Sequence, residues 1–264
     1  MDKDYNAFLK KVKGKLNIDL TLYKEAQMKR RLSSLRDKRG YSNFQTYYQA
    51  LDKDPQLLTE FIERLTINVS EFLRNPKRWD VLRDKVIPNL LQTTDTLKIW
   101  SAACSTGEEP YSLALLMHAY FPKVNYTILA TDIDKKVLEQ ANQGVYQQKA
   151  LKELSPEHIE TYFTNKNGLY TVKSHLKKNI TFKRHNLLSD PYPKNVDLIV
   201  CRNVLIYFTD DAKEVIYANF SNALKQTGIL FVGSTEQIFQ PLTYDLSVFD
   251  TFFYQKSKSG ERLD

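Results

Sequence analysis

The sequence is poor in cysteine and has no long apolar run. Cys104 and Cys201 are its only cysteines, and no CxxC or Cys/His spacing indicates a metal or redox pair, so we expect two free buried thiols and no metal. No stretch approaches the roughly eighteen uninterrupted apolar residues of a membrane span, and the charged start MDKDYNAFLKK has no apolar signal segment. We therefore expect a cytoplasmic protein.

The chain also lacks internal repeats and low-complexity segments, which argues against a fibrous or disordered protein. Its 264 residues are 42% hydrophobic and 12% aromatic, enough for a proper core in one large domain or two smaller ones. The net charge of +7 is uneven: residues 1–95 hold 19 Lys and Arg against 13 Asp and Glu, and the rest hold 19 against 18. The first third is therefore the basic part.

One predicted helix, Tyr23–Arg39, carries much of that charge. Met28, Leu32 and Leu35 form a narrow apolar stripe along it, and Gly40 ends it. Its basic residues are either a solvated face or a docking surface for an acidic protein or nucleic acid. The candidate partner-binding residues are Arg30, Arg31, Arg36 and Lys38.

Periodicity divides the chain into two architectures. Up to about residue 90 every periodic segment is helical, including one behind a Ser42 N-cap and one opened by Asp54 and Pro55. Beyond it, near-continuous apolar strands (97–102, 126–131, 180–185, 196–201, 229–233 and 249–255) alternate with helices, which is typical of an α/β parallel sheet covered on both faces.

Between about residues 142 and 180 lies a stretch too long for an ordinary loop. Asn167-Gly168 predicts a short hairpin there, and Ser155-Pro156 predicts a helix start before it. The expected organisation is a helical domain (1–72), a linker helix (73–95) and a sheet domain (96–264) with a small antiparallel insertion at about 145–179.

The segment SAACSTGEEPY (101–111) closes one strand and opens a helix with Glu108 and Glu109. Ligands bind at such places in open α/β sheets, but two carboxylates would repel a pyrophosphate. They suit a cation, and S-adenosylmethionine carries a sulfonium and an ammonium group. The alternative needs no ligand, because Pro110 and two acids also make an ordinary helix start.

Polar residues follow the next strands as well. Asp132 stands where a carboxylate binds ribose hydroxyls in related sheets, whereas Asp134 is expected to cap the next helix. Because the carboxyl ends of parallel strands share one edge, these groups indicate a common ligand site. The other candidates at this edge are Asn186, Leu187, Arg202 and Asn203.

Five segments, TINVSEFLRN (66–75), SAACSTGEEPYS (101–112), ATDID (130–134), HNLL (185–188) and CRNVLIYF (201–208), together resemble the chemotaxis receptor methyltransferases of the CheR family. The resemblance spans nearly the whole chain. It implies a Rossmann-like methyltransferase sheet with an inserted β-subdomain behind an all-α domain. It also implies methyl transfer from S-adenosylmethionine to glutamates on the cytoplasmic helical bundle of chemoreceptors, with S-adenosylhomocysteine as product.

The resemblance also assigns roles. It implies that Glu109, or Glu108 as the second choice, holds the methionyl part of the cofactor. It also implies that Asp132 holds the ribose. Tyr207 is implied beside the transferred methyl group, the alternative being a packed aromatic, and Arg74 is the second candidate for catalysis. The other implied cofactor contacts are Asn68, Ser70 and Arg74 from the linker side, and Asn186, Leu187, Arg202 and Asn203.

The hairpin TNKNGLYTV is shorter than in members that tether to a receptor pentapeptide, so we expect no such tether and contact with the membrane only through receptors. A nucleic-acid methyltransferase and a non-catalytic adaptor are the alternative functions. Base methylation typically places Asn/Asp-Pro-Pro-aromatic after the fourth strand, where this chain has CRNVLIYF, so we expect no nucleic acid. The intact set of cofactor-facing residues argues against an adaptor.

Overall fold

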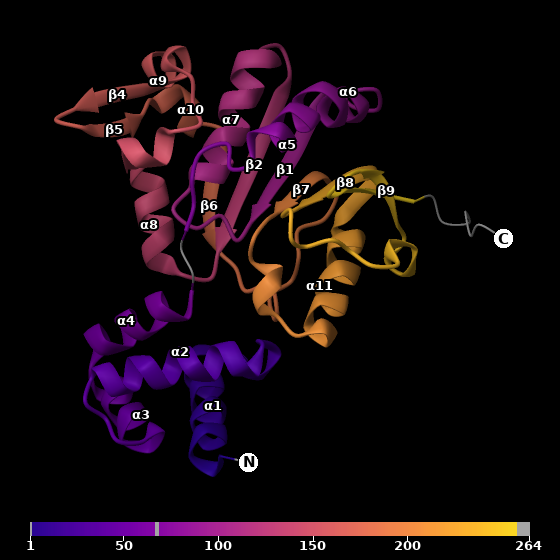
Figure 1. Ribbon diagram of the computed structural model, residues 1–264. Coiled ribbons are helices and arrows are strands. Elements are labelled where there is room, and N and C mark those ends of the chain that lie inside the picture. The colour runs from indigo at the N-terminus through magenta and orange to yellow at the C-terminus, as the bar shows by residue number, and fades with distance from the viewer. Residues whose placement is uncertain (1, 67–68, 258–264) are drawn as a thin grey trace. The chain divides into compact units, whose positions relative to one another are not determined.

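A computed structural model describes residues 2–66 and 69–257. They form two compact units (Figure 1). The helical unit contains the first part of the chain, to residue 66, and the segments 186–190 and 204–216; the sheet unit contains the other described residues. Within these residues no helix has the length and apolarity needed to cross a membrane.

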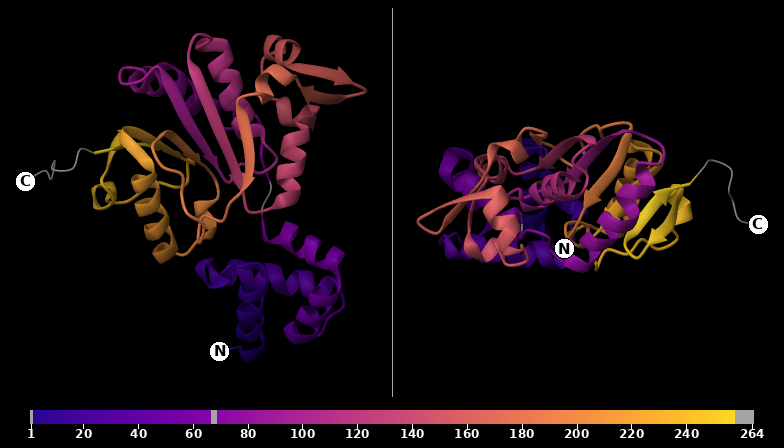
Figure 2. Two further views of the ribbon diagram at one scale, coloured as in Figure 1. Left: turned by 180° about the vertical axis from the view of Figure 1, so that it is seen from behind. Right: turned by 90° about the horizontal axis from the view of Figure 1, so that it is seen from above.

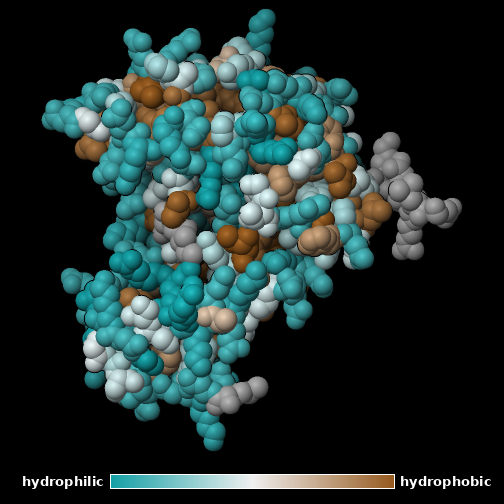
Figure 3. All heavy atoms as spheres, in the orientation of Figure 1, coloured by the Kyte–Doolittle hydropathy of each residue, from teal (hydrophilic) through white to brown (hydrophobic). Residues whose placement is uncertain are grey.

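Four helices lie wholly within the helical unit: α1 (Lys3–Leu16), α2 (Glu25–Lys38), α3 (Phe44–Lys53) and α4 (Pro55–Leu65). The rings of Phe8, Tyr47 and Phe61 form its centre, with centroids 5.9 to 6.2 Å apart. The predicted stripe of α2 is confirmed, since its three apolar residues are buried. Hydrophilic residues dominate the face of this unit that Figure 3 shows.

Helix starts in this unit follow local side-chain signals. Asp54 accepts hydrogen bonds from the backbone N–H groups of Gln56 and Leu57 at the start of α4, as predicted. The predicted Ser42 cap is wrong, because the side chain of Asn43 accepts the N–H of Thr46 instead. Asn and Ser are equally good caps, so the sequence did not distinguish the two neighbours.

The sheet unit contains a seven-stranded sheet in the order β6-β2-β1-β7-β8-β10-β9. Five strands pair in parallel, and the last two pairings, β8 with β10 and β10 with β9, are antiparallel, which confirms the predicted fold class. The strands are β1 (Thr96–Ala102), β2 (Asn125–Asp132), β6 (Ile180–Arg184), β7 (Val196–Cys201), β8 (Leu224–Val232), β9 (Leu246–Asp250) and β10 (Phe253–Lys256). The single strand predicted at 249–255 is wrong, because the chain turns at Phe252, whose φ of 71° breaks the extended backbone.

Helices cover both faces of this sheet. Ile99 joins a core cluster with α5 (Pro76–Val81), a π-helical turn (Leu82–Val86), α6 (Ile87–Leu90) and α7 (Glu108–Tyr120). Its neighbour Trp100 points to the opposite face, where its ring lies 5.5 Å from that of Phe220 on α11 (Asp210–Ala223). Helix α8 (Lys135–Gln143) packs beside β2 and β6. This double covering explains the near-continuous apolar strands.

The insertion is a three-stranded antiparallel sheet in the order β3-β5-β4. Its elements are β3 (Val145–Gln147), α9 (Pro156–Tyr162), β4 (Phe163–Lys166), β5 (Leu169–Val172) and α10 (Ser174–Lys177). The Asn167-Gly168 hairpin is confirmed: both residues have positive φ, as its tight turn requires. The hairpin projects from the sheet unit (Figure 2), while Phe72 packs edge-on against Tyr146 at its base.

Candidate functional site

The turn between β1 and α7 has an unusual backbone. Ala103, Ser105 and Gly107 have φ values of 65°, 49° and 96°, in the left-handed region. A Cβ atom at Gly107 would lie 2.8 Å from the Cβ of Ala141 and 3.0 Å from the hydroxyl of Tyr146. Only glycine fits there, and the turn is held in one conformation by its neighbours. Backbone strain of this kind gathers at functional sites.

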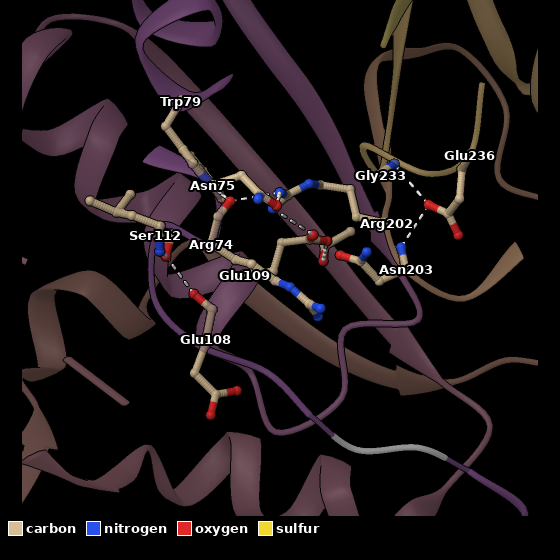
Figure 4. A network of polar contacts seen from close by, with 12 residues as sticks. Arg74, Asn75, Trp79, Glu108, Glu109, Ser112, Arg202, Asn203, Gly233 and Glu236 are labelled. Carbon is tan, nitrogen blue, oxygen red and sulfur yellow. Dashed lines mark hydrogen bonds and ion pairs between the residues drawn. The ribbon is translucent and has the colours of Figure 1, made fainter. Parts of the chain in front are cut away.

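Glu109 projects from the first turn of α7 toward Arg202 and Asn203 (Figure 4). Its Oε1 accepts a hydrogen bond of 2.7 Å from the Ser101 hydroxyl, and its Oε2 lies 3.9 Å from Nη1 of Arg202. The side chain is only 13% exposed, and burial raises its pKa to about 7 although Arg202 opposes the shift. A carboxylate so poorly solvated suits a cationic ligand such as a sulfonium or ammonium group.

Glu108 points in a different direction (Figure 4). Its Oε2 accepts a hydrogen bond of 2.7 Å from Thr106, and its carbonyl accepts one of 2.7 Å from the Ser112 hydroxyl. Ser112 in turn accepts the N–H of Leu73, so this group ties the linker to α7. Burial raises the pKa of Glu108, and hydrogen bonds from Thr106 and Ser70 oppose that shift. The structure therefore places Ser70 beside Glu108.

Asp132, at the end of β2, holds the same turn from the other side. Its Oδ2 accepts the N–H of Ser105 at 2.9 Å and its Oδ1 accepts the N–H of Asp134 at 3.1 Å. Burial raises its pKa to about 6. Asp134 caps α8 through the N–H of Lys136, as predicted. The N–H of Ile133 is a third backbone donor to Asp132, and a carboxylate offers about four lone-pair sites, so binding a ribose hydroxyl is compatible with its structural role.

Arg202, after β7, is buried, and its guanidinium packs against the rings of Trp79 and Phe231, whose centroids are 5.7 and 4.8 Å away. Its Nη2 donates to the carbonyl of Arg74 at 2.6 Å and to Oδ1 of Asn75 at 3.1 Å. The guanidinium thus fixes the turn that carries Arg74. The Arg74 side chain is half-buried, and its Nη1 donates to the carbonyl of Val69 at 3.1 Å.

Asn203 follows with a φ of 61° and is held by a residue that the sequence did not indicate. The Oε2 of Glu236 accepts the N–H groups of Asn203 at 2.6 Å and Gly233 at 2.8 Å (Figure 4). The one available signal was an acid shortly after the fifth parallel strand, in the loop GSTE. The prediction considered strand ends only up to the fourth.

The other predicted site residues near the strand ends belong to the helical unit. Leu187 is buried, and the amide Nδ2 of Asn186 donates to the carbonyl of Asn17 at 3.0 Å. The Tyr207 ring is half-buried and faces the Arg31 guanidinium at 5.8 Å. These three residues therefore belong to a different unit from Glu109, and Asn68 lies outside the described residues.

The four basic candidates on α2 differ. Arg31 donates to the carbonyl of Leu65 at 2.7 Å in addition to its contact with Tyr207. Arg36 is half-buried, pairs with the adjacent Asp37 and lies over the ring of Phe44. Arg30 and Lys38 are exposed. Only these last two have the full exposure expected of a docking surface.

Comparison with known families agrees with this site. Residues 68–252 match the family model for the CheR methyltransferase, SAM binding domain, and residues 3–66 match that for the CheR methyltransferase, all-alpha domain. Fold and site therefore define an S-adenosylmethionine-dependent methyltransferase, an enzyme.

Whole proteins of known families are similar to this chain over most of its length. The chain is 47% identical to a chemotaxis protein methyltransferase of Listeria innocua over 97% of its own length and 98% of that protein. It is 34% identical to one of Borreliella burgdorferi, with 89% and 88% covered, and 35% identical to one of Escherichia coli, with 78% and 73% covered. The chain belongs to the CheR methyltransferase family.

Proposed function

We propose that this protein methylates glutamate side chains on the cytoplasmic helical bundle of chemoreceptors, forming γ-glutamyl methyl esters during adaptation in bacterial chemotaxis. The observation that carries the proposal is the poorly solvated Glu109 carboxylate between Ser101 and Arg202, in a chain that matches both CheR models. When bound, S-adenosylmethionine supplies the methyl group as a sulfonium, and S-adenosylhomocysteine is the product. We place the enzyme in the cytoplasm, in contact with the membrane only through receptors.

The residues proposed to bind the cofactor follow the carboxyl ends of strands or belong to the linker. Glu109 is preferred over Glu108 for the methionyl part, because Glu108 is engaged with Thr106 and faces elsewhere. Arg202 contributes by holding the turn of Arg74. The full proposed set is Asn68, Ser70, Arg74, Glu108, Glu109, Asp132, Asn186, Leu187, Arg202 and Asn203.

The chemistry needs no general base on the protein. A substrate glutamate near its reference pKa of about 4.3 is already ionised at neutral pH. Its oxygen forms the new bond to the methyl carbon, the carbon–sulfur bond breaks, and sulfur keeps the electron pair. An anion and a cation lose charge in this step, so alignment and exclusion of water by the protein account for most of the acceleration. Tyr207 is the proposed orienting group for the glutamate, and Arg74 is assigned to the cofactor.

The receptor is proposed to dock on the exposed charges of α2. Arg30 and Lys38 suit a carboxylate-rich helical bundle, and electrostatic attraction raises the rate of association. The division into a helical domain (1–72), a linker (73–95) and a methyltransferase domain (96–264) with an insertion at about 145–179 belongs to the same proposal.

Incubation with methyl-labelled cofactor and membranes that carry chemoreceptors tests the function. Label transferred to the receptor should be released as methanol when the pH is raised, because methyl esters hydrolyse. Label that resists alkali would indicate N-methylation, and label on added nucleic acid would indicate the alternative enzyme. Absence of any transfer, together with binding of the receptor, would leave an adaptor.

Charge reversal on α2 tests the docking surface. Arg30→Glu with Lys38→Glu should lower the rate of receptor methylation several-fold at low salt and leave cofactor affinity unchanged. Lys10→Glu on α1 is the matched control, since Lys10 is an exposed lysine of the same unit. Equal loss in the control would contradict a specific surface.

The proposed absence of a tether has its own test. Calorimetry with the C-terminal receptor pentapeptide should give no measurable binding to this protein. A micromolar dissociation constant would refute this part of the proposal and leave the catalytic function untouched.

A further inference from the structure

Glu236 lies in the loop after β8 and is only 4% exposed. Its Oε2 accepts two backbone hydrogen bonds, from Asn203 at 2.6 Å and from Gly233 at 2.8 Å (Figure 4). Hydrogen bonds to an ionised acceptor are stronger than neutral ones. One carboxylate oxygen thus ties the loop after β7 to the end of β8, at the edge of the sheet where Glu109 lies.

Both backbone partners have a geometry that needs such a tie. Asn203 has a φ of 61°, in the left-handed region, which Asn adopts more readily than most residues but still at a cost relative to the right-handed region. Gly233 is pressed against Asn203, because a Cβ there would overlap Oε2 of Glu236 and lie 2.9 Å from the Asn203 nitrogen. The close approach of the two backbones leaves room for the carboxylate oxygen and for no side chain at 233.

The same carboxylate acts electrostatically on the site. Its negative charge contributes to the raised pKa of Glu109 and opposes the lowering of the Arg202 pKa by burial. Glu109, Arg202 and Glu236 therefore interact with one another beyond the carboxyl ends of β1, β7 and β8, and the charge of Arg74 acts on Glu109 and Arg202 as well.

We infer that Glu236 is a positioning residue for cofactor binding, which fixes the left-handed backbone of Asn203 so that this residue presents its polar groups to S-adenosylmethionine. The inference rests on the proposed cofactor contact of Asn203. Glu236 acts through Asn203 and need not contact the cofactor itself.

Calorimetry with S-adenosylhomocysteine tests this role without a receptor. Glu236→Ala should weaken binding about tenfold or more, because Asn203 loses its fixed conformation. Glu236→Gln should bind within about threefold of the wild type, because its amide oxygen can accept the same two N–H groups. Asp197→Ala is the matched control: Asp197 is a buried carboxylate at the start of β7 that accepts the N–H of Lys98 at 2.7 Å.

Asp197→Ala should lose stability in urea, as Glu236→Ala does, but retain wild-type affinity. Unchanged affinity in Glu236→Ala, equal loss of affinity in the control, or failure of Glu236→Gln to restore binding would each overturn the inference. If Glu236→Ala does not fold, Glu236→Asp carries the same prediction, since its carboxylate is one methylene too short to reach both N–H groups. Absence of binding by the wild-type protein would instead refute the proposed function.

Discussion

Buried carboxylates at the two ends of the parallel strands differ in how far neighbouring groups compensate their charge. At the amino end of β7, Asp197 is buried but pairs with Nζ of Lys225 at 2.7 Å and accepts the N–H of Lys98 at 2.7 Å. At the carboxyl ends, burial raises the pKa of Glu109 to about 7 and that of Asp132 to about 6, and the Arg202 guanidinium stays 3.9 Å from Glu109. The buried carboxylate at the amino end is therefore neutralised by an ion pair, whereas those of Glu109 and Asp132 at the carboxyl end have no such close cation beside them among the described residues.

The backbone shows the same contrast. Left-handed residues other than glycine gather at the carboxyl edge, in the turns 73–75, 103–105 and at 203, while the amino edge has Asn195 and Thr227. Strain and incompletely paired charge both cost stability, and they persist in proteins where binding or catalysis uses them. The difference between the two edges therefore locates the functional one without reference to any ligand.

The largest predicted effect is the dependence of stability on pH. A carboxyl whose pKa is raised on folding binds its proton more tightly in the folded state, so the contribution of Glu109 to stability is fully present below its ordinary pKa of 4.5 and is lost as pH rises through about 7. In Glu109→Gln this loss should disappear, leaving the variant more stable than the wild type at pH 8 by on the order of 3 kcal/mol. Urea unfolding of both proteins at pH 5 and pH 8 measures it, and an equal difference at both pH values would contradict the raised pKa.

Next in size is the cost of filling the turn at Gly107. Gly107→Ala should lower the free energy of unfolding by about 2 to 3 kcal/mol, because it adds overlap with Ala141 to an unfavourable φ. Gly168→Ala is the control, since Gly168 has a φ of 79° but nothing within 4 Å. Its cost should be only about 1 kcal/mol. Equal losses would show that the turn can relax around a methyl group.

Replacement of Glu109 by glutamine should lower the affinity for the cofactor about tenfold. Glu109→Gln removes the charge that we propose to hold the ammonium group, which S-adenosylhomocysteine retains, while the amide can still accept from Ser101. Calorimetry with S-adenosylhomocysteine should show the loss, and Glu108→Gln should lose less. A larger loss for Glu108→Gln would reverse the assignment of the two acids.

The smallest effect belongs to the amino end. Asp197→Asn keeps an acceptor for the N–H of Lys98 but loses the ion pair with Lys225, which should cost about 1 kcal/mol. Cofactor affinity should not change. A change in cofactor affinity would show that the two edges of the sheet are coupled, and it would contradict the conclusion that only the carboxyl edge is functional.

The site could be predicted in part. The acidic turn was visible because both glutamates are adjacent in sequence and start a helix after an apolar strand. Glu236 was missed because its partners, Asn203 and Gly233, come from two different loops, and no local pattern marks such a contact. For Arg31 and Lys38, helical geometry alone made the two equivalent, whereas packing gives Arg31 a carbonyl partner and leaves Lys38 exposed.

The sequence by itself determined the order of elements, the parallel sheet, the Asn167-Gly168 hairpin and the acidic turn, because these depend on local backbone preferences and on the periodicity of apolar residues. It did not separate β9 from β10, where a single left-handed residue turns the chain. Only the tertiary structure decided which glutamate faces Arg202, how far burial raises its pKa, and that Glu236 holds Asn203. Desolvation and through-space contact depend on residues far apart in the chain, so they arise only when the strand ends come together.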